Sequence, residues 1–207
     1  MLNVTRQGGK SSVVAIKTLH KAEYNPGALI LLLSPSQRQS AELMLKVKEF
    51  HRTGDLTADS DTILSLVLPN RSRIVALPGK EGTIRGFSGV DKLVIDEAAR
   101  VADALYYSVR PMLAVSGGEI ELLSTPFGKR GFFFEEWDHG VGWHRMEADA
   151  TQCPRISAAF LAQERRTMGE YFYSQEYLCQ FNDAQTSAFS YEDVQAALGE
   201  QVQTWTL

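Results

Sequence analysis

The stretch Gly8-Gly9-Lys10-Ser11 constrains this chain more than any other part of its sequence. Small residues let backbone N–H groups approach phosphate oxygens, a lysine reaches the outer phosphates, and a serine hydroxyl can hold Mg²⁺. Because a helix N-terminus favours negative charge, the motif predicts a phosphate-binding loop (P-loop) that opens a helix over about Ser11–Lys21. By itself the motif is weak evidence, since the first glycine of the standard pattern would fall at Val4.

A second motif strengthens the first. The apolar residues Leu93–Ile95 end in two carboxylates, Asp96 and Glu97. A buried strand with acids at its carboxyl end is typical of P-loop enzymes, where one acid supports Mg²⁺ and the other activates water. The alternative is an ordinary helix N-terminus that follows a strand and favours acids. The order of the two motifs along the chain favours the functional interpretation.

A third pattern, Glu121–Pro126, is a strand that ends in the hydroxyl residues Ser124 and Thr125. In many P-loop enzymes a polar residue at this place senses the γ-phosphate and couples hydrolysis to movement. Ser-Thr-Pro also makes a good turn, so the pattern is weak without the other two. In this order along the chain it predicts a coupling element.

The remaining pattern alternates short apolar runs with amphipathic ones and predicts an α/β fold with a mainly parallel sheet flanked by helices, of the P-loop NTPase (ASCE/RecA-like) class. Ala28–Leu33 is typical of a buried parallel strand. We expect Ile63–Leu68 and Arg73–Leu77 to form an antiparallel pair at one edge. Further helices are expected after Ser36 to about Thr53, after Ile95 to about Val109, over most of Ile156–Phe181, and over Tyr191–Leu198.

Composition limits the class of protein. The 207 residues are 44% hydrophobic, without an apolar run near the length of a membrane helix and without a signal-peptide pattern. We therefore expect a cytoplasmic protein of a bacterial cell. The cysteines Cys153 and Cys179 show no metal-binding spacing and are expected to be reduced thiols. The net charge of −4 argues mildly against strong autonomous DNA binding, but leaves a local basic patch open.

Together these motifs resemble the motor (ATPase) half of phage terminase large subunits, over about residues 4–195. The form of the P-loop, with an Arg-Gln pair before Gly-Gly-Lys-Ser, is the most specific point of resemblance. The segments that carry the resemblance are Thr5–Ser11, Leu31–Ser40, Leu77–Gly89, Asp96–Ala99, Ser124–Gly128 and Phe172–Phe181.

The resemblance implies a role for each matched residue. ATP would be held by Gln7, Gly8, Gly9, Lys10, Ser11 and Ser12, and Mg²⁺ by Ser11 and Asp96. Glu97 would activate water, and Ser124 and Thr125 would couple hydrolysis to motion. Arg6 resembles an arginine placed near the γ-phosphate of its own subunit, and Arg85 one suggested to reach a neighbour's ATP. Guanidinium groups suit both tasks because they present several donors to a charged transition state.

Two departures from the family pattern stand out. Only four residues precede Thr5, where the family has a strand, so we expect that strand to be missing and the sheet to have an unpaired edge. No late apolar strand ending in Asp follows the motor pattern, so nuclease activity is not expected. We divide the chain into a motor core, residues 1–183, and a tail, residues 184–207, that would lead to an absent nuclease domain. A gene fragment or degraded prophage would explain both departures.

The resemblance implies ATP hydrolysis coupled to the packaging of double-stranded DNA, by a ring of subunits that works with a portal protein and a small terminase subunit. Two alternatives stay open. The chain is an inactive remnant that binds nucleotide weakly or not at all, or it is another DNA-translocating P-loop ATPase. A small-molecule kinase fits the order of motifs poorly.

Overall fold

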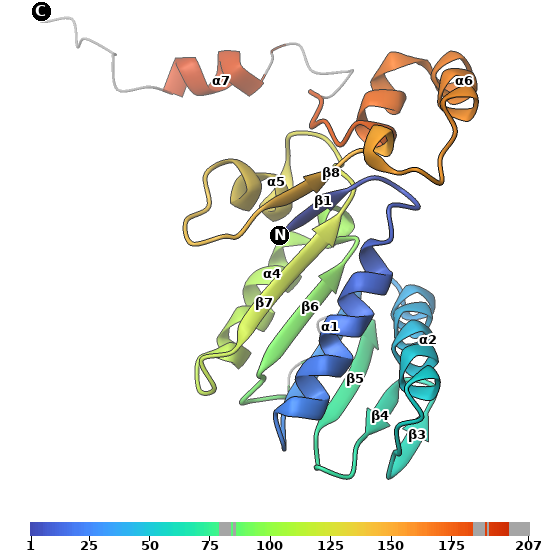
Figure 1. The fold of residues 1–207 in the computed structure, drawn as a ribbon. Helices are drawn as coiled ribbons and strands as arrows, with labels where there is room; N and C mark the ends of the chain where they lie inside the picture. The colour runs from blue at the N-terminus through green and yellow to red at the C-terminus, as the bar shows by residue number, and fades with distance from the viewer. Residues whose placement is uncertain (79–83, 85, 184–188, 190, 199–207) are drawn as a thin grey trace, which may run out of the picture.

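The computed structural model describes residues 1–78, 84, 86–183, 189 and 191–198, and these form a sheet covered by helices (Figure 1). The strands are β1 Leu2–Val4, β2 Leu29–Ser34, β3 Ser60–Thr62, β4 Ser65–Val67, β5 Arg73–Pro78, β6 Lys92–Asp96, β7 Glu119–Ser124 and β8 Met146–Ala148. The α-helices are α1 Lys10–Tyr24, α2 Gln37–Thr53, α4 Asp103–Val109, α5 Gly131–Asp138, α6 Ala158–Tyr177 and α7 Tyr191–Leu198, and short 3₁₀ turns are η1 Ala98–Arg100, η2 Arg110–Leu113 and η3 Ala150–Gln152.

The strand order is β3-β4-β5-β2-β6-β7-β1-β8. The strands from β5 to β8 pair in parallel, whereas β3 and β4 extend the sheet antiparallel at the β5 side. The expected α/β fold with a mainly parallel sheet is therefore confirmed, as is the antiparallel pair at one edge. In parallel sheets the carboxyl ends of the strands lie along one edge, where ligands bind.

The strand β2 shows why this sheet is buried on both faces. All of its residues are buried. Leu29, Leu31 and Leu33 pack in the apolar core under α4 and α5, while Ile30 and Leu32 pack in a second core under α1 and α2. This alternation is the two-residue period of a strand, and a strand buried on both faces reads as a continuous apolar run.

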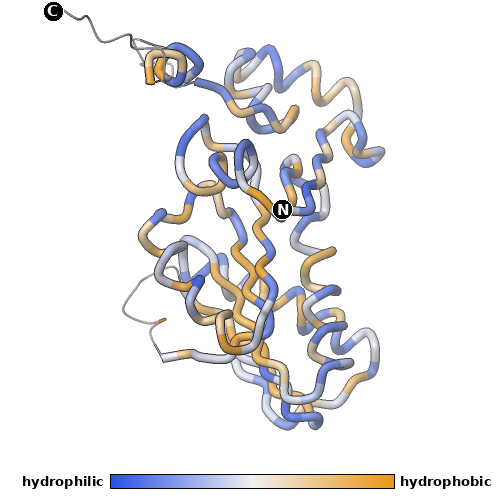
Figure 2. The backbone as a smooth tube through the Cα atoms, turned by 90° about the vertical axis from the view of Figure 1, so that its left-hand side faces the viewer, coloured by the Kyte–Doolittle hydropathy of each residue, from blue (hydrophilic) through white to orange (hydrophobic). Residues whose placement is uncertain are grey.

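Helices cover both faces of the sheet. In Figure 1, α1 and α2 lie on one face and α4 on the other, with α6 beyond the carboxyl ends of the strands. Figure 2 shows that the hydrophobic residues concentrate in the strands, between the two layers of helices. Among the described residues, none of the helices combines the length and apolar character needed to cross a bilayer.

The expectation that the strand before the P-loop is missing is wrong. Leu2–Val4 form β1, which lies between β7 and β8 and pairs with both in parallel. Asn3 in its centre is fully buried, and its side-chain amide donates to the Cys179 carbonyl. At the place where we expected an unpaired edge, β1 pairs with β8.

Other elements differ in detail from the sequence interpretation. The helix expected directly after β6 begins as the turn η1 and becomes α-helical only at Asp103. The expected helix over Ile156–Phe181 corresponds to α6, which is interrupted at Gly169, where φ is +77°. In the tail, Tyr191–Leu198 is helical as expected, and Tyr191 packs edge-on against Phe134 of α5.

Candidate functional site

The P-loop connects β1 to α1. The Gly8 N–H donates to the Thr5 carbonyl at 3.1 Å and closes a turn, in which Gln7 has a left-handed φ of +61°. Gly8 has no room for a side chain, because a Cβ there would lie 2.6 Å from Val4 Cγ1. The sequence thus uses a small residue where the backbone returns close to its own strand.

The first turn of α1 begins directly after the loop. Gly9 precedes it with φ +92° and gives no side-chain cap, so the α1 N-terminus keeps amide donors available. The carbonyl of Gly9 accepts from the N–H groups of Ser12 and Val13. Lys10 and Ser11, both half-buried, start the helix. Such a terminus favours an anion.

The two acids stand at the carboxyl end of β6. Asp96 is its last residue and is 8% exposed. Glu97 follows in a left-handed conformation, φ +51°, and its N–H donates to Asp96 Oδ1 at 2.9 Å. A non-glycine residue in this region is strained, and such strain is common at functional sites.

The P-loop and the acids meet in space. Lys10 Nζ lies 3.3 Å from Glu97 Oε1, and Ser11, Asp96 and Glu97 line one cavity of about 130 Å³. Burial, and then the charge of Glu97, raise the pKa of Asp96 to about 6, although Lys10 acts in the opposite direction. The Asp96 carboxyl therefore loses its proton less readily than an exposed aspartate does.

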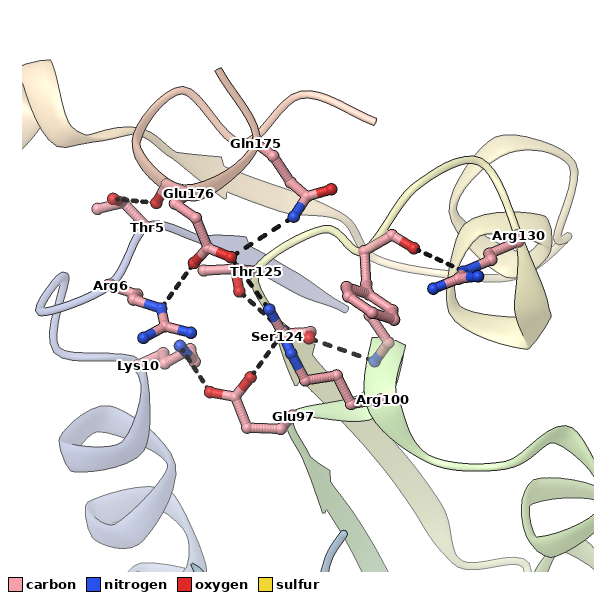
Figure 3. Close-up of polar contacts among 12 residues, drawn as sticks. Thr5, Arg6, Lys10, Glu97, Arg100, Ser124, Thr125, Arg130, Gln175 and Glu176 are labelled. Atoms are coloured by element: carbon pink, nitrogen blue, oxygen red, sulfur yellow. Dashed lines mark hydrogen bonds and ion pairs between the residues drawn. The ribbon is translucent and has the colours of Figure 1, made fainter. Parts of the chain in front are cut away.

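The end of β7 lies between these two groups, because β7 is the strand between β6 and β1. Ser124 and Thr125 are both fully buried. Ser124 Oγ accepts from the Ala99 N–H of η1 at 3.2 Å. The P-loop, Asp96 with Glu97, and Ser124 with Thr125 thus form one group at the carboxyl edge of the sheet, which we call the strand-end site (Figure 3).

The two expected arginines have different outcomes. Arg6 belongs to the strand-end site, and its Nε donates to Glu176 Oε2 at 2.6 Å, with most of its side chain exposed. Arg85 lies outside the described residues, as do residues 79–83.

Three charged residues at the strand-end site were not identified from the sequence. Arg100 of η1 contacts Glu97, Thr125 and Glu176. Glu176, in the last turn of α6, pairs with both Arg6 and Arg100. Arg155 donates from Nη2 to the Gln7 carbonyl at 3.1 Å, across the P-loop. The only sequence signal for Glu176 was its position inside Phe172–Phe181, the segment of family resemblance.

Comparisons with known proteins agree on one family. A family model described as terminase large subunit, T4likevirus-type, N-terminal, matches residues 1–196. The large terminase ATPase domain of Thermus phage P74-26 has a similar structure, with a TM-score of 0.75 at 19% identity, and the match covers 87% of each chain. Comparison with curated protein sequences finds no match.

Two longer chains are also similar in structure. The large terminase of a thermophilic bacteriophage in complex with ADP matches with a TM-score of 0.74 at 11% identity, over 87% of this chain and 48% of that one. The HK97 bacteriophage large terminase matches at 0.65 and 16% identity, over 87% and 46%. The present chain thus spans about half the length of these two proteins. At sequence identities this low, the structural similarity establishes the fold, which is that of a P-loop ATPase.

Proposed function

The chain belongs to the family of T4-like-virus-type terminase large subunits, N-terminal part, and on that premise we propose that its strand-end site hydrolyses ATP to power the packaging of phage DNA. The observation that carries this proposal is the contact between Lys10 of the P-loop and Glu97 after β6, with Ser124 and Thr125 beside them. These residue types, at the carboxyl edge of a parallel sheet, are those that phosphoryl transfer requires.

ATP is the nucleotide that we propose for this site. Its phosphates would lie in the P-loop turn, with Lys10 for charge and the free amides of the α1 N-terminus as donors. Gln7, Gly8, Gly9 and Ser12 would shape that turn. A related large terminase was crystallised in complex with ADP, which supports a nucleotide at the corresponding edge of the sheet.

The residues also fit a magnesium ion. The hydroxyl of Ser11 and the carboxyl of Asp96 line the same cavity, and both offer the oxygen ligands that Mg²⁺ prefers. Burial and the neighbouring charge of Glu97 raise the pKa of Asp96, and a divalent cation would act against both by favouring the charged carboxylate. When bound, the ion would neutralise developing charge on the phosphate oxygens.

Each of the protein's own residues at the site would then have a separate role in the reaction. Glu97 accepts the proton of the attacking water, the water oxygen bonds to the γ-phosphorus, and the bond to the β–γ bridging oxygen breaks to leave ADP and phosphate. Lys10 and Arg6 stabilise negative charge in the transition state. Arg85 is proposed to act on the ATP of a neighbouring subunit. Ser124 and Thr125 are proposed to transmit hydrolysis to movement.

The cellular partners follow from the family. We propose that the chain acts on double-stranded DNA, within a ring of like subunits, and together with a portal protein and a small terminase subunit in the cytoplasm of the infected bacterium. Cleavage of DNA is not proposed for this chain, because the family match is to the N-terminal part and the structural match covers an ATPase domain.

The family match does not favour the two alternatives. The inactive remnant was suggested by a missing strand, and β1 occupies that place. Another DNA-translocating ATPase would share the fold, but the family model covers residues 1–196, which include the Arg-Gln pair before the glycines.

The test is Mg²⁺-dependent ATP hydrolysis by the 207-residue chain beside its Lys10→Ala variant, with nucleotide binding measured in the same samples. We expect turnover in the wild type and none in the variant. Lys21→Ala, near the other end of α1, is the matched control, because its lysine makes only a 3.8 Å pair with Glu119. A wild-type chain with neither turnover nor nucleotide binding would support the remnant instead.

A further inference from the structure

Arg100 connects three parts of the strand-end site through a single guanidinium group. Its Nη1 donates to Glu97 Oε2 and to Thr125 Oγ1, both at 3.2 Å, and its Nη2 donates to Glu176 Oε1 at 3.1 Å. These partners come from the end of β6, the end of β7 and the last turn of α6 (Figure 3). A planar guanidinium with several fixed donors can make such contacts at once, whereas a lysine cannot.

The backbone reinforces the contact between Arg100 and Glu97. The Arg100 N–H donates to the Glu97 carbonyl at 2.8 Å, so the turn η1 is closed by the same two residues whose side chains pair. This double link supports the left-handed backbone of Glu97. The direction of the Glu97 carboxylate therefore depends on the position of Arg100.

Phe127 supports the guanidinium without using its donors. The Arg100 Cζ lies 4.9 Å from the centre of the Phe127 ring. Arg130 also contacts this ring, at 4.4 Å, and donates to the Phe127 carbonyl, but among the described residues it contacts neither Glu97 nor Glu176. The side chains of Arg100, Glu97 and Glu176 are each less than one quarter exposed, so water screens their interactions only in part.

The two carboxylate oxygens of Glu97 face different cations. Oε1 pairs with Lys10 and Oε2 with Arg100. In the proposed function Lys10 is required by the phosphates of ATP, which leaves Arg100 as the cation that continues to orient Glu97.

We propose that Arg100 is a positioning residue for hydrolysis: it holds the Glu97 carboxylate in the orientation needed to activate water and links it to Thr125 and to Glu176 of α6. This inference rests on the proposed ATPase function. A positioning residue of this kind should affect the chemical step and leave nucleotide binding almost unchanged, because Arg100 contacts the proposed base and, within the described part of the chain, makes no contact with the P-loop.

The experiment compares steady-state ATP hydrolysis and nucleotide Kd for the full chain and two variants, Arg100→Ala and Arg130→Ala. For Arg100→Ala we expect kcat to fall about 10- to 100-fold, with Kd changed less than about threefold, because misplacement of a catalytic group is costly. Arg130→Ala removes the other arginine that contacts Phe127, and this variant is expected to keep the wild-type kcat. A wild-type kcat in Arg100→Ala would overturn the proposal, as would an equal loss in Arg130→Ala.

Two further measurements separate positioning from a general structural role. In a Glu97→Gln background, Arg100→Ala should cause no additional loss, because the group that it positions no longer acts as a base. If Arg100→Ala does not fold, Arg100→Lys takes its place. This variant should keep only part of kcat, since a lysine cannot span all three partners, and full activity would overturn the proposal. A wild-type chain without turnover would overturn the proposed function itself, whereas an active wild type with unaffected variants would overturn this inference alone.

Discussion

The Lys10 ammonium and the Glu97 carboxylate, which the proposed reaction assigns to ATP and to water, lie 3.3 Å apart and pair with each other. The pair is partly buried, with side chains 9% and 22% exposed. In the proposed function the nucleotide phosphates draw Lys10 away from Glu97, while Glu97 keeps its second contact with Arg100.

Glu97→Gln tests this relationship directly. We expect kcat to fall by at least about 100-fold, because an amide cannot accept the proton of the attacking water. Nucleotide should bind as tightly as in the wild type or a few times more tightly, because Lys10 no longer has to leave a carboxylate. Single-turnover hydrolysis and equilibrium nucleotide binding measure the two effects. Wild-type turnover would remove Glu97 from the base role, and weaker binding would contradict the competition for Lys10.

The sequence predicted those parts of the site that depend on residue type within a local pattern. Lys10 and Ser11 follow glycines, and Asp96 and Glu97 end an apolar strand, so each could be placed at the carboxyl edge from its neighbours alone. The strand β2 was equally visible, because burial on both faces requires a continuous apolar run.

Other elements left no local signal. Arg100 and Glu176 are 76 residues apart, and only the tertiary fold, which places α6 beyond the carboxyl ends of the strands, brings them together. The strand β1 is three residues long and contains a buried polar residue, Asn3, whose side-chain amide nitrogen donates to the distant Cys179 carbonyl. We expected this strand to be missing because only four residues precede Thr5, and a strand this short with a polar residue shows no apolar periodicity that would have indicated it.

Gly8→Ala should disturb the P-loop by steric contact. The added methyl would lie 2.6 Å from Val4 Cγ1 and 3.0 Å from the Thr5 carbonyl oxygen, so the turn must shift. We expect KM for ATP to rise about tenfold or more, since a displaced loop no longer directs its amides at the phosphates. Gly27→Ala is the control, because its φ of +77° carries backbone strain with no neighbour within 4 Å and it lies outside the strand-end site. Equal effects in both variants would contradict the steric explanation.

Arg155→Ala should weaken nucleotide binding without altering the chemical step. Arg155 donates to the Gln7 carbonyl across the P-loop and contacts no acid of the strand-end site among the described residues. A charged hydrogen bond at an exposed position stabilises the loop by about 1 kcal/mol, which corresponds to a rise of roughly fivefold in KM. Arg165→Ala, an exposed arginine of α6 that pairs with Glu170, should leave KM unchanged. A fall in kcat at constant KM would assign Arg155 a different role.

Glu121→Gln should reveal a buried ion pair that stabilises the fold in a pH-dependent way. Glu121 of β7 is 8% exposed in its side chain, and it pairs with Lys17 at 2.5 Å and with the buried Lys92 at 2.7 Å. Burial alone would raise the pKa of Glu121, but the hydrogen bonds from these lysines outweigh it and hold the pKa below its ordinary value. Removal of the charge leaves Lys92 without its strongest partner, and we expect a loss of about 3 kcal/mol in the free energy of unfolding at pH 7.

The sign of the pH dependence follows from the lowered pKa of Glu121. A carboxyl group whose pKa is lower in the folded than in the unfolded state stabilises the fold fully above the unfolded-state value, and this stabilisation disappears as the pH falls through the folded-state value. Chemical denaturation should therefore give the full difference in the free energy of unfolding between wild type and Glu121→Gln at pH 7. This difference should shrink below about pH 4. Glu119→Gln, whose side chain is 53% exposed, should cost less than about 1 kcal/mol. A difference for Glu121→Gln that stays constant or grows on acidification would contradict the lowered pKa.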